Sequence, residues 1–148
     1  MQNPKVFLGG TVEGPDWRSL YEKYLEIDYF NPVVKNWTQG DRLNGEQEKL
    51  ICNIHFHLIN SNQKGFYSIA EMIQSSNDPS KQTVVQFISD GFDEAQIKSI
   101  KAILIMLKGN GAVANITNNY LDAISILNNY VKTNRSDENK TIKDRKST

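Results

Sequence analysis

Short apolar runs alternate along this chain with longer segments in which apolar residues recur every three or four positions. The short runs are four to six residues long and occupy residues 5–8, 27–30, 54–59, 83–88 and 111–116. Runs of this length that end at Gly, Pro, Asn or Ser predict buried strands. The sequence therefore predicts five strands, each separated from the next by a segment of another kind.

The intervening segments have the period of amphipathic helices. Helices are predicted over residues 15–25, 46–52, 66–76, 93–107 and 118–131, with Pro15 in a first turn and Asp93 as an N-terminal cap. Residues 33–43 are predicted to be irregular, with Trp37 as their anchor. Strands that alternate with helices favour an α/β fold, a flavodoxin-like three-layer sandwich with a five-stranded parallel sheet in the order 2-1-3-4-5.

Composition narrows the class of protein further. The 148 residues suit one domain, which we assign to residues 1–133, followed by a polar, disordered tail over 134–148. The formal net charge is zero, which argues against a nucleic-acid polymer as partner. A single cysteine, Cys52, and no signal-peptide pattern favour a cytoplasmic location. No apolar run approaches the roughly 18 residues of a membrane span, so no membrane partner is expected.

Candidate chemistry gathers where strands end, because ligands of open parallel sheets bind at the carboxyl ends of the strands. The strand-end segments are Gly9-Gly10-Thr11, residues 60–71 and Ser89-Asp90-Gly91. Glu71 is the leading candidate, since it lies in the first turns of a helix that follows a buried strand. The alternative is that Glu71 only complements the helix dipole. Gly9 and Gly10 either let a ligand approach the backbone or only form a tight turn. Neither a dinucleotide-binding fingerprint nor a P-loop is present.

Three segments of the chain resemble the nucleoside 2-deoxyribosyltransferase family, in particular its short, divergent branch. They are Val6-Phe7-Leu8-Gly9-Gly10-Thr11, then Tyr29-Phe30-Asn31-Pro32-Val33-Val34 with Trp37, and Gly65-Phe66-Tyr67-Ser68-Ile69-Ala70-Glu71. The resemblance implies a flavodoxin-like fold and cleavage of the N-glycosidic bond of a deoxynucleoside or its monophosphate. It also implies that Glu71 is the nucleophile and that several copies of the chain assemble into a homo-oligomer. No cofactor is expected, and no metal either, because the chain has no paired Cys motif and His55 and His57 stand alone as possible ligands.

The chain departs from this family at the residues expected to protonate the leaving base. The family often has Asp before the third strand and at its end, where this chain has Asn53 and Asn60, and Phe7 stands where Tyr is common. An amide can hydrogen-bond a base or a sugar but is not a proton donor of the carboxylic-acid kind. Asp90 is therefore the remaining candidate acid, or else a turn residue before Gly91.

Each of several other polar and aromatic residues has two interpretations, one structural and one functional. His55 and His57 share one face of a strand and either pack beneath a helix or ligate a metal; we favour packing. Tyr67 either orients Glu71 or stacks on a base, and Ser68 either binds substrate or caps the helix. Trp17 and Trp37 either cover a nucleobase or pack in the core. Thr11 is a further candidate for contact with a sugar or phosphate.

We therefore expect a small-molecule nucleoside or nucleotide as ligand. The leading hypothesis is N-glycoside cleavage by sugar transfer or hydrolysis, with Glu71, Asp90 and Tyr67 as catalytic residues. The alternatives are an NAD-type glycohydrolase and a non-catalytic protein that binds or sequesters a nucleotide. The candidate substrate-binding residues are Phe7, Gly9, Gly10, Thr11, Trp37, Asn53, Asn60 and Ser68. The residues Tyr120, Ile126 and Tyr130 are candidates for an interface between copies.

Overall fold

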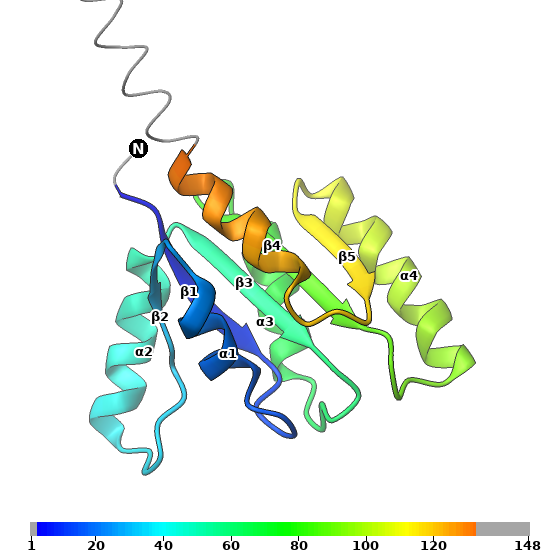
Figure 1. The fold of residues 1–148 in the computed structure, drawn as a ribbon, viewed down its shortest axis with the longest axis horizontal. Coiled ribbons are helices and arrows are strands. Elements are labelled where there is room, and N and C mark those ends of the chain that lie inside the picture. The colour runs from blue at the N-terminus through cyan, green and yellow to red at the C-terminus, as the bar shows by residue number, and fades with distance from the viewer. Residues whose placement is uncertain (1–2, 133–148) are drawn as a thin grey trace, which may run out of the picture.

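The computed structural model describes residues 3–132 and contains a five-stranded parallel sheet in the order β2-β1-β3-β4-β5 (Figure 1). The labelled elements are β1 (Lys5–Gly10), α1 (Trp17–Tyr24), β2 (Asp28–Phe30), α2 (Gln39–Ile51), β3 (Ile54–Ile59), α3 (Tyr67–Ser76), β4 (Gln82–Ile88), α4 (Glu94–Gly109) and β5 (Val113–Thr117). A further helix covers residues 122–132. This arrangement confirms the predicted α/β fold and the predicted strand order.

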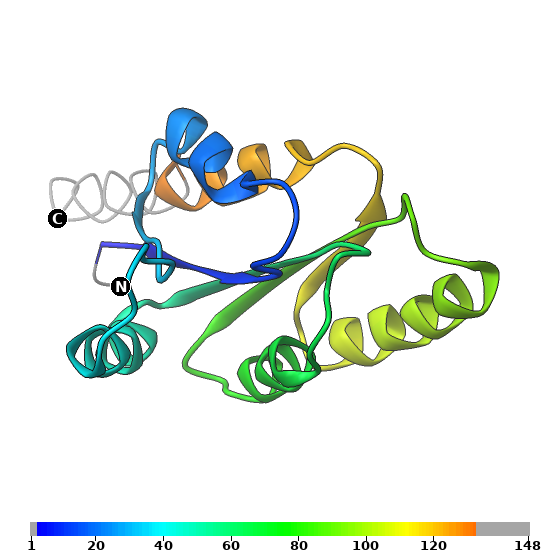
Figure 2. The ribbon, with the colours of Figure 1, turned by 90° about the horizontal axis from the view of Figure 1, so that it is seen from below.

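The helices form two layers, one on each face of the sheet (Figure 2). Helix α1 and the helix over 122–132 cover one face, and α2, α3 and α4 cover the other. Alternate residues of each strand face opposite layers, which divides the apolar interior into two clusters. Under α1, the rings of Trp17, Tyr21 and Phe56 pack with centroids 5.3–5.7 Å apart. Under α3 and α4, Met72, Leu107 and Phe87 are fully buried.

Helix α2 is the element that the sequence analysis placed wrongly. Residues 33–43 were expected to be irregular, with a short helix from Glu46, but α2 already begins at Gln39. Its start is fixed by a capping box, in which Thr38 accepts from the backbone N–H of Asp41 while the Asp41 carboxylate accepts from that of Thr38. The apolar periodicity of this segment is weak because α2 contains no fully buried residue.

The end of β1 also differs from the expectation. Gly9 and Gly10 were expected to form a turn after Leu8, but they continue the strand and pair with His57 and Leu58 of β3. Gly10 has a φ of 112°, and a Cβ atom there would lie 2.1 Å from the carbonyl oxygen of Leu58. Only glycine fits this close approach of two strands at the edge where ligands bind.

The carboxyl-terminal helix packs on its own sheet. Tyr120, Ile126 and Tyr130, expected to contribute to an interface between copies, are partly buried against the cluster under α1. The Tyr21 hydroxyl also donates to the backbone oxygen of Tyr120. These side chains therefore complete the fold of one chain. The tail predicted over 134–148 lies outside the described residues. Among the helices of residues 3–132, none has the length and apolar character to cross a membrane.

Candidate functional site

A cleft of about 610 Å³ opens at the carboxyl end of β1, between α2 and the start of α3. The loop before α2 forms one lip through Pro32, Val33, Val34 and Trp37. We call it the aromatic cleft, because Phe7, Trp37 and Tyr67 line it. Trp37 is 62% exposed and Tyr67 72% exposed, so both rings offer open faces to a ligand. The volume lies within the usual range of small-molecule sites.

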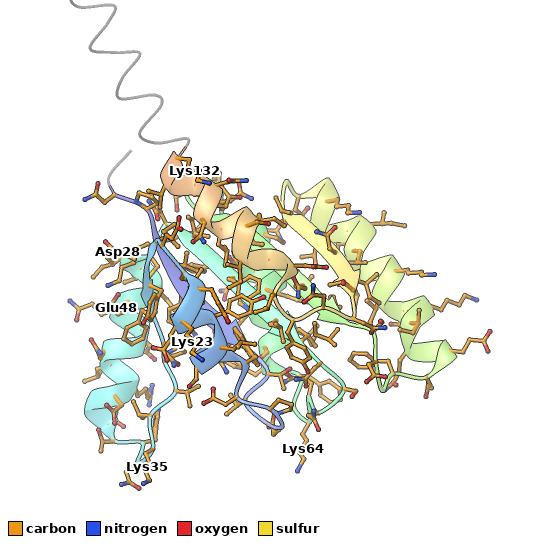
Figure 3. The ribbon with its side chains drawn as sticks, viewed as in Figure 1. Lys23, Asp28, Lys35, Glu48, Lys64 and Lys132 are labelled. Carbon is orange, nitrogen blue, oxygen red and sulfur yellow. The ribbon has the colours of Figure 1, made fainter. Side chains whose placement is uncertain are left out.

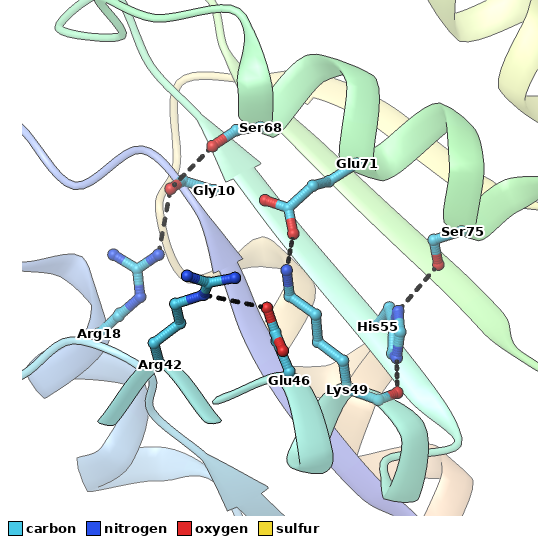
Figure 4. A network of polar contacts seen from close by, with 9 residues as sticks. All are labelled: Gly10, Arg18, Arg42, Glu46, Lys49, His55, Ser68, Glu71 and Ser75. Atoms are coloured by element: carbon cyan, nitrogen blue, oxygen red, sulfur yellow. Dashed lines mark hydrogen bonds and ion pairs between the residues drawn. The ribbon is translucent and has the colours of Figure 1, made fainter. Parts of the chain in front are cut away.

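Glu71 lies in the wall of this cleft, five residues into α3. Its Oε2 atom forms an ion pair with the ammonium group of Lys49 from α2 (Figure 4). Its Oε1 atom accepts no hydrogen bond from residues 3–132. The Lys49 ammonium also lies 5.7 Å from the ring centroid of Phe7 and 5.6 Å from that of Tyr67. The pair therefore holds one carboxylate oxygen toward α2 and leaves the other for a ligand.

A chain of hydrogen bonds holds the backbone of α2 in place at Lys49. The Nε2 atom of His55 donates to the carbonyl oxygen of Lys49 at 2.8 Å, so Nδ1 accepts from the Ser75 hydroxyl at 3.1 Å. Ser75 in turn accepts from the Thr83 hydroxyl at 2.6 Å. Burial lowers the pKa of His55 below its usual range, which keeps the ring neutral and suited to this pattern. His55 thus ties α2 to α3 and β4.

A buried arginine closes the inner end of the cleft. The Arg18 guanidinium donates to the carbonyl oxygens of Leu8 and Thr11 at 2.9 Å and of Gly10 at 3.2 Å, and it lies over the Trp17 ring. Burial lowers the pKa of Arg18 to about 10, so the group stays charged at neutral pH. This cation braces the turn after β1 and adds positive charge to the cleft wall.

A second cavity, of about 440 Å³, adjoins the aromatic cleft. We call it the inner cavity. Glu46, Lys49, Tyr67 and Glu71 line both spaces. The inner cavity is also lined by His57, which is 3% exposed and whose two ring nitrogens have no hydrogen-bond partner within residues 3–132. Burial, with smaller effects of His55, Lys49 and Arg18, lowers the pKa of His57 to about 3. His57 is therefore neutral at physiological pH.

The aromatic cleft brings together some of the residues singled out from the sequence. The predicted site residues that line it are Phe7, Gly10, Trp37, Tyr67, Ser68 and Glu71. Ser68 donates weakly to the Gly10 carbonyl oxygen, at 3.4 Å, and it does not cap α3. The two tryptophans, which had the same two interpretations, differ in the structure. Trp17 is 2% exposed and belongs to the core, whereas Trp37 lines the cleft.

Neither asparagine at the ends of β3 reaches the cleft. Asn53 lies at the amino end of the strand, where its side chain accepts from the backbone N–H of Lys5 at 2.8 Å. Asn60 is 1% exposed and is held by the Tyr120 hydroxyl and the backbone of Asn62. The sequence analysis placed both in the substrate site. The structure places one at the opposite edge of the sheet and one in the interior.

Three further predicted residues also lie outside the cleft lining. Thr11 is buried, donates to Gln63 at 2.6 Å and accepts from the backbone of Asn60, so its hydroxyl is already engaged. Gly9 is buried in β1, where a Cβ atom would lie 3.0 Å from the Nδ1 atom of His57; it makes room for that ring. Asp90 is an exposed turn residue after β4 and does not line the cleft, which favours its turn interpretation.

The sequence analysis missed the contribution of α2. Arg42, Glu46 and Lys49 are spaced four and three residues apart, and all three line the aromatic cleft from one face of the helix. This spacing was the available signal, but it required α2 to extend to Gln39. Two lysines elsewhere on the surface, Lys35 and Lys64, do not contribute to the cleft in the way that Lys49 does. Both are exposed, point away from the molecule in Figure 3 and do not line the cleft.

The surroundings of His55 and His57 bear on the metal interpretation of this pair. Within residues 3–132, no three His, Cys, Asp or Glu side chains are close enough together to hold a metal ion. His55 is engaged by Lys49 and Ser75, as the packing interpretation expected, whereas His57 has no such partner.

Comparisons of the chain with models of known protein families and with curated proteins give no match. The functional argument therefore rests on the geometry of the aromatic cleft and on the residues that line it.

Proposed function

We propose that this protein cleaves the N-glycosidic bond of a deoxynucleoside, nucleoside or nucleotide, with the Glu71 carboxylate as nucleophile. The observation that carries the proposal is the position of Glu71 in the aromatic cleft. One of its oxygens pairs with Lys49, the other has no hydrogen-bond partner within residues 3–132, and Phe7, Tyr67 and Trp37 line the same cleft. A carboxylate beside open aromatic faces suits a ligand that combines a sugar with a planar base.

The chemistry follows from the charge that develops on the sugar. As the bond from C1′ to the base breaks, positive charge spreads over C1′ and the ring oxygen. The free Oε1 atom of Glu71 stabilises this charge and then forms the covalent glycosyl-enzyme. Water or a second base releases the sugar in the next step. The exposed ring of Trp37 provides a stacking surface for the base at the lip of the cleft.

A non-catalytic role as a nucleotide-binding protein is the second candidate. One observation favours it: the ammonium of Lys49 already neutralises Glu71, and Asn53, Asn60 and Asp90 do not supply an acid at the cleft. Such a protein would bind a nucleotide and release it unchanged.

The test compares the wild type with Glu71→Gln on deoxynucleosides, their 5′-monophosphates and NAD, with and without an added free base. Chromatography follows release or exchange of the base. We expect release by the wild type and its loss in Glu71→Gln, with Glu48→Gln as a control. Glu48 is also a glutamate paired with a lysine, Lys5, but it lines neither cavity (Figure 3).

The outcomes separate the candidates. Turnover that is unchanged in Glu71→Gln refutes the assigned nucleophile. Exchange with the added base indicates a transferase, release without exchange indicates a hydrolase, and activity restricted to NAD indicates an NAD-type glycohydrolase. Binding without any turnover by the wild type supports the sequestering role. Assembly into a homo-oligomer and a cytoplasmic location stay predictions, and light scattering of the purified chain tests the first.

A further inference from the structure

Cleavage of an N-glycosidic bond requires a proton donor for the departing base, because a base that leaves as an anion is a poor leaving group. The inference below rests on the proposed function. Asp90, the acid expected from the sequence, does not line the aromatic cleft. Among residues 3–132, the carboxylic acids that do line the cleft are the closest chemical substitutes for Asp90.

The aromatic cleft has three carboxylic acids in its lining, namely Asp41, Glu46 and Glu71. Glu71 is assigned as the nucleophile. Asp41 is occupied by the start of α2, where its Oδ2 atom accepts from the backbone N–H of Thr38 at 2.9 Å and from the Thr38 hydroxyl at 2.8 Å. Glu46 is the acid whose only polar side-chain contact within residues 3–132 is an ion pair with Arg42 on the same helix.

Glu46 faces Glu71 across the cleft. It projects from α2 whereas Glu71 projects from α3, and both side chains line the aromatic cleft and the inner cavity. Its Oε1 atom accepts from Arg42 Nε at 3.3 Å, and its Oε2 atom has no hydrogen-bond partner within residues 3–132. In the view of Figure 4 the carboxylates of Glu46 and Glu71 are drawn on either side of the Lys49 ammonium, which forms its ion pair with Glu71. A sugar seated against Glu71 would thus have a second carboxyl group on the opposite wall.

We propose that Glu46 is the acid–base catalyst that works with Glu71. In the first step the protonated Glu46 carboxyl transfers its proton to a ring nitrogen of the base. The electron pair of the broken C1′–N bond stays with the base, and Glu71 Oε1 bonds to C1′. In the second step the Glu46 carboxylate takes a proton from water, whose oxygen bonds to C1′, and Glu71 leaves as a carboxylate. Two carboxyl groups divide the work of retaining glycosidases in this way.

The test varies the need for the proton. The base of 2′-deoxyguanosine has to be protonated as it leaves, whereas the base of 7-methyl-2′-deoxyguanosine carries a positive charge already and leaves as a neutral molecule. Glu46→Gln should lower kcat/KM about 10² to 10⁴-fold on the first nucleoside and change it little on the second. Glu48→Gln, on the same helix but outside both cavities, is the control.

A second measurement applies to any nucleoside with an uncharged base that the wild type cleaves. A proton in flight gives a solvent deuterium isotope effect on kcat/KM, and we expect Glu46→Gln to abolish this effect. Equal losses on both nucleosides, or an isotope effect that survives in Glu46→Gln, would overturn the role of Glu46 while leaving Glu71 as nucleophile. A wild type that cleaves none of the deoxynucleosides, their 5′-monophosphates or NAD would overturn the proposed function and this inference together.

Discussion

The buried ring of His57 should make this protein sensitive to mild acid. His57 lies on the floor of the inner cavity, and neither ring nitrogen has a partner within residues 3–132. The groups around it that act on its charge are His55, Lys49 and Arg18, and all of them disfavour a proton on the ring. Replacing His57 by Leu, an apolar side chain of similar size, removes this group from the titration of the protein.

The size of the expected loss in unfolding free energy follows from the two pKa values of His57, one in the unfolded chain and one in the folded protein. In the unfolded chain the ring has the ordinary value of about 6.5, and in the folded protein burial lowers the pKa to about 3. Below pH 6.5 the ring therefore binds a proton in the unfolded state but not in the folded state. The free energy of unfolding falls as the pH falls, and this loss is complete near pH 3. Between pH 7 and pH 5 the linkage relation gives a loss of about 2 kcal/mol.

Urea denaturation followed by circular dichroism at pH 7 and pH 5 measures the effect. We expect the wild type to lose about 2 kcal/mol more than His57→Leu over this interval, equivalent to a difference of about 1 M in the urea midpoint. His55 is present in both proteins, so its own titration largely cancels from the comparison. Equal losses in the two proteins would refute the conclusion that His57 is held neutral in the folded state.

Substitutions at four further positions test the cleft, the sheet edge beneath it and α2. Lys49→Met should lower kcat about 10²-fold because the nucleophile loses its orientation, and Lys49→Arg should restore most of it in steady-state assays. Trp37→Ala should raise KM about tenfold with little change in kcat, since it removes a stacking surface. Gly10→Ala should cost about 4 kcal/mol or more in urea denaturation, because its Cβ would lie 2.1 Å from the Leu58 oxygen. Gly45→Ala, in α2 with no atom within 4 Å of the added Cβ, should instead stabilise the protein by about 0.5–1 kcal/mol.

The fold was predictable from the sequence because the strands and most helices bury one or both faces, and a buried face gives a regular pattern of apolar residues. The strand at Ile54–Ile59 was predicted with its observed bounds, and Asp93 was correctly assigned as the cap of α4. Helix α2 was not, because it buries no residue fully and its start depends on polar contacts between Thr38 and Asp41. A helix that is stabilised by capping and ion pairs leaves little trace in an apolar pattern.

The composition of the cleft was predictable only where one segment of chain carries it. Tyr67, Ser68 and Glu71 follow β3 directly, so their place at the carboxyl edge of the sheet follows from the strand itself. Lys49 reaches the cleft from an element whose length was misjudged. Asn53 was assigned to the cleft through the family resemblance, although a residue that directly precedes β3 lies at the amino end of the strand, away from the carboxyl ends that line the cleft.

The residues that the sequence analysis missed complete the charge balance of the proposed reaction. Arg42, Glu46, Lys49 and Glu71 alternate in charge across the two helices. When Glu46 gives up its proton it becomes an anion, and when Glu71 bonds to the sugar it becomes a neutral ester. Lys49 lines both cavities with these two acids and forms its ion pair with Glu71. In the proposed reaction this cation offsets the negative charge first of Glu71 and then of Glu46, which couples the proposed nucleophile to the proposed proton donor.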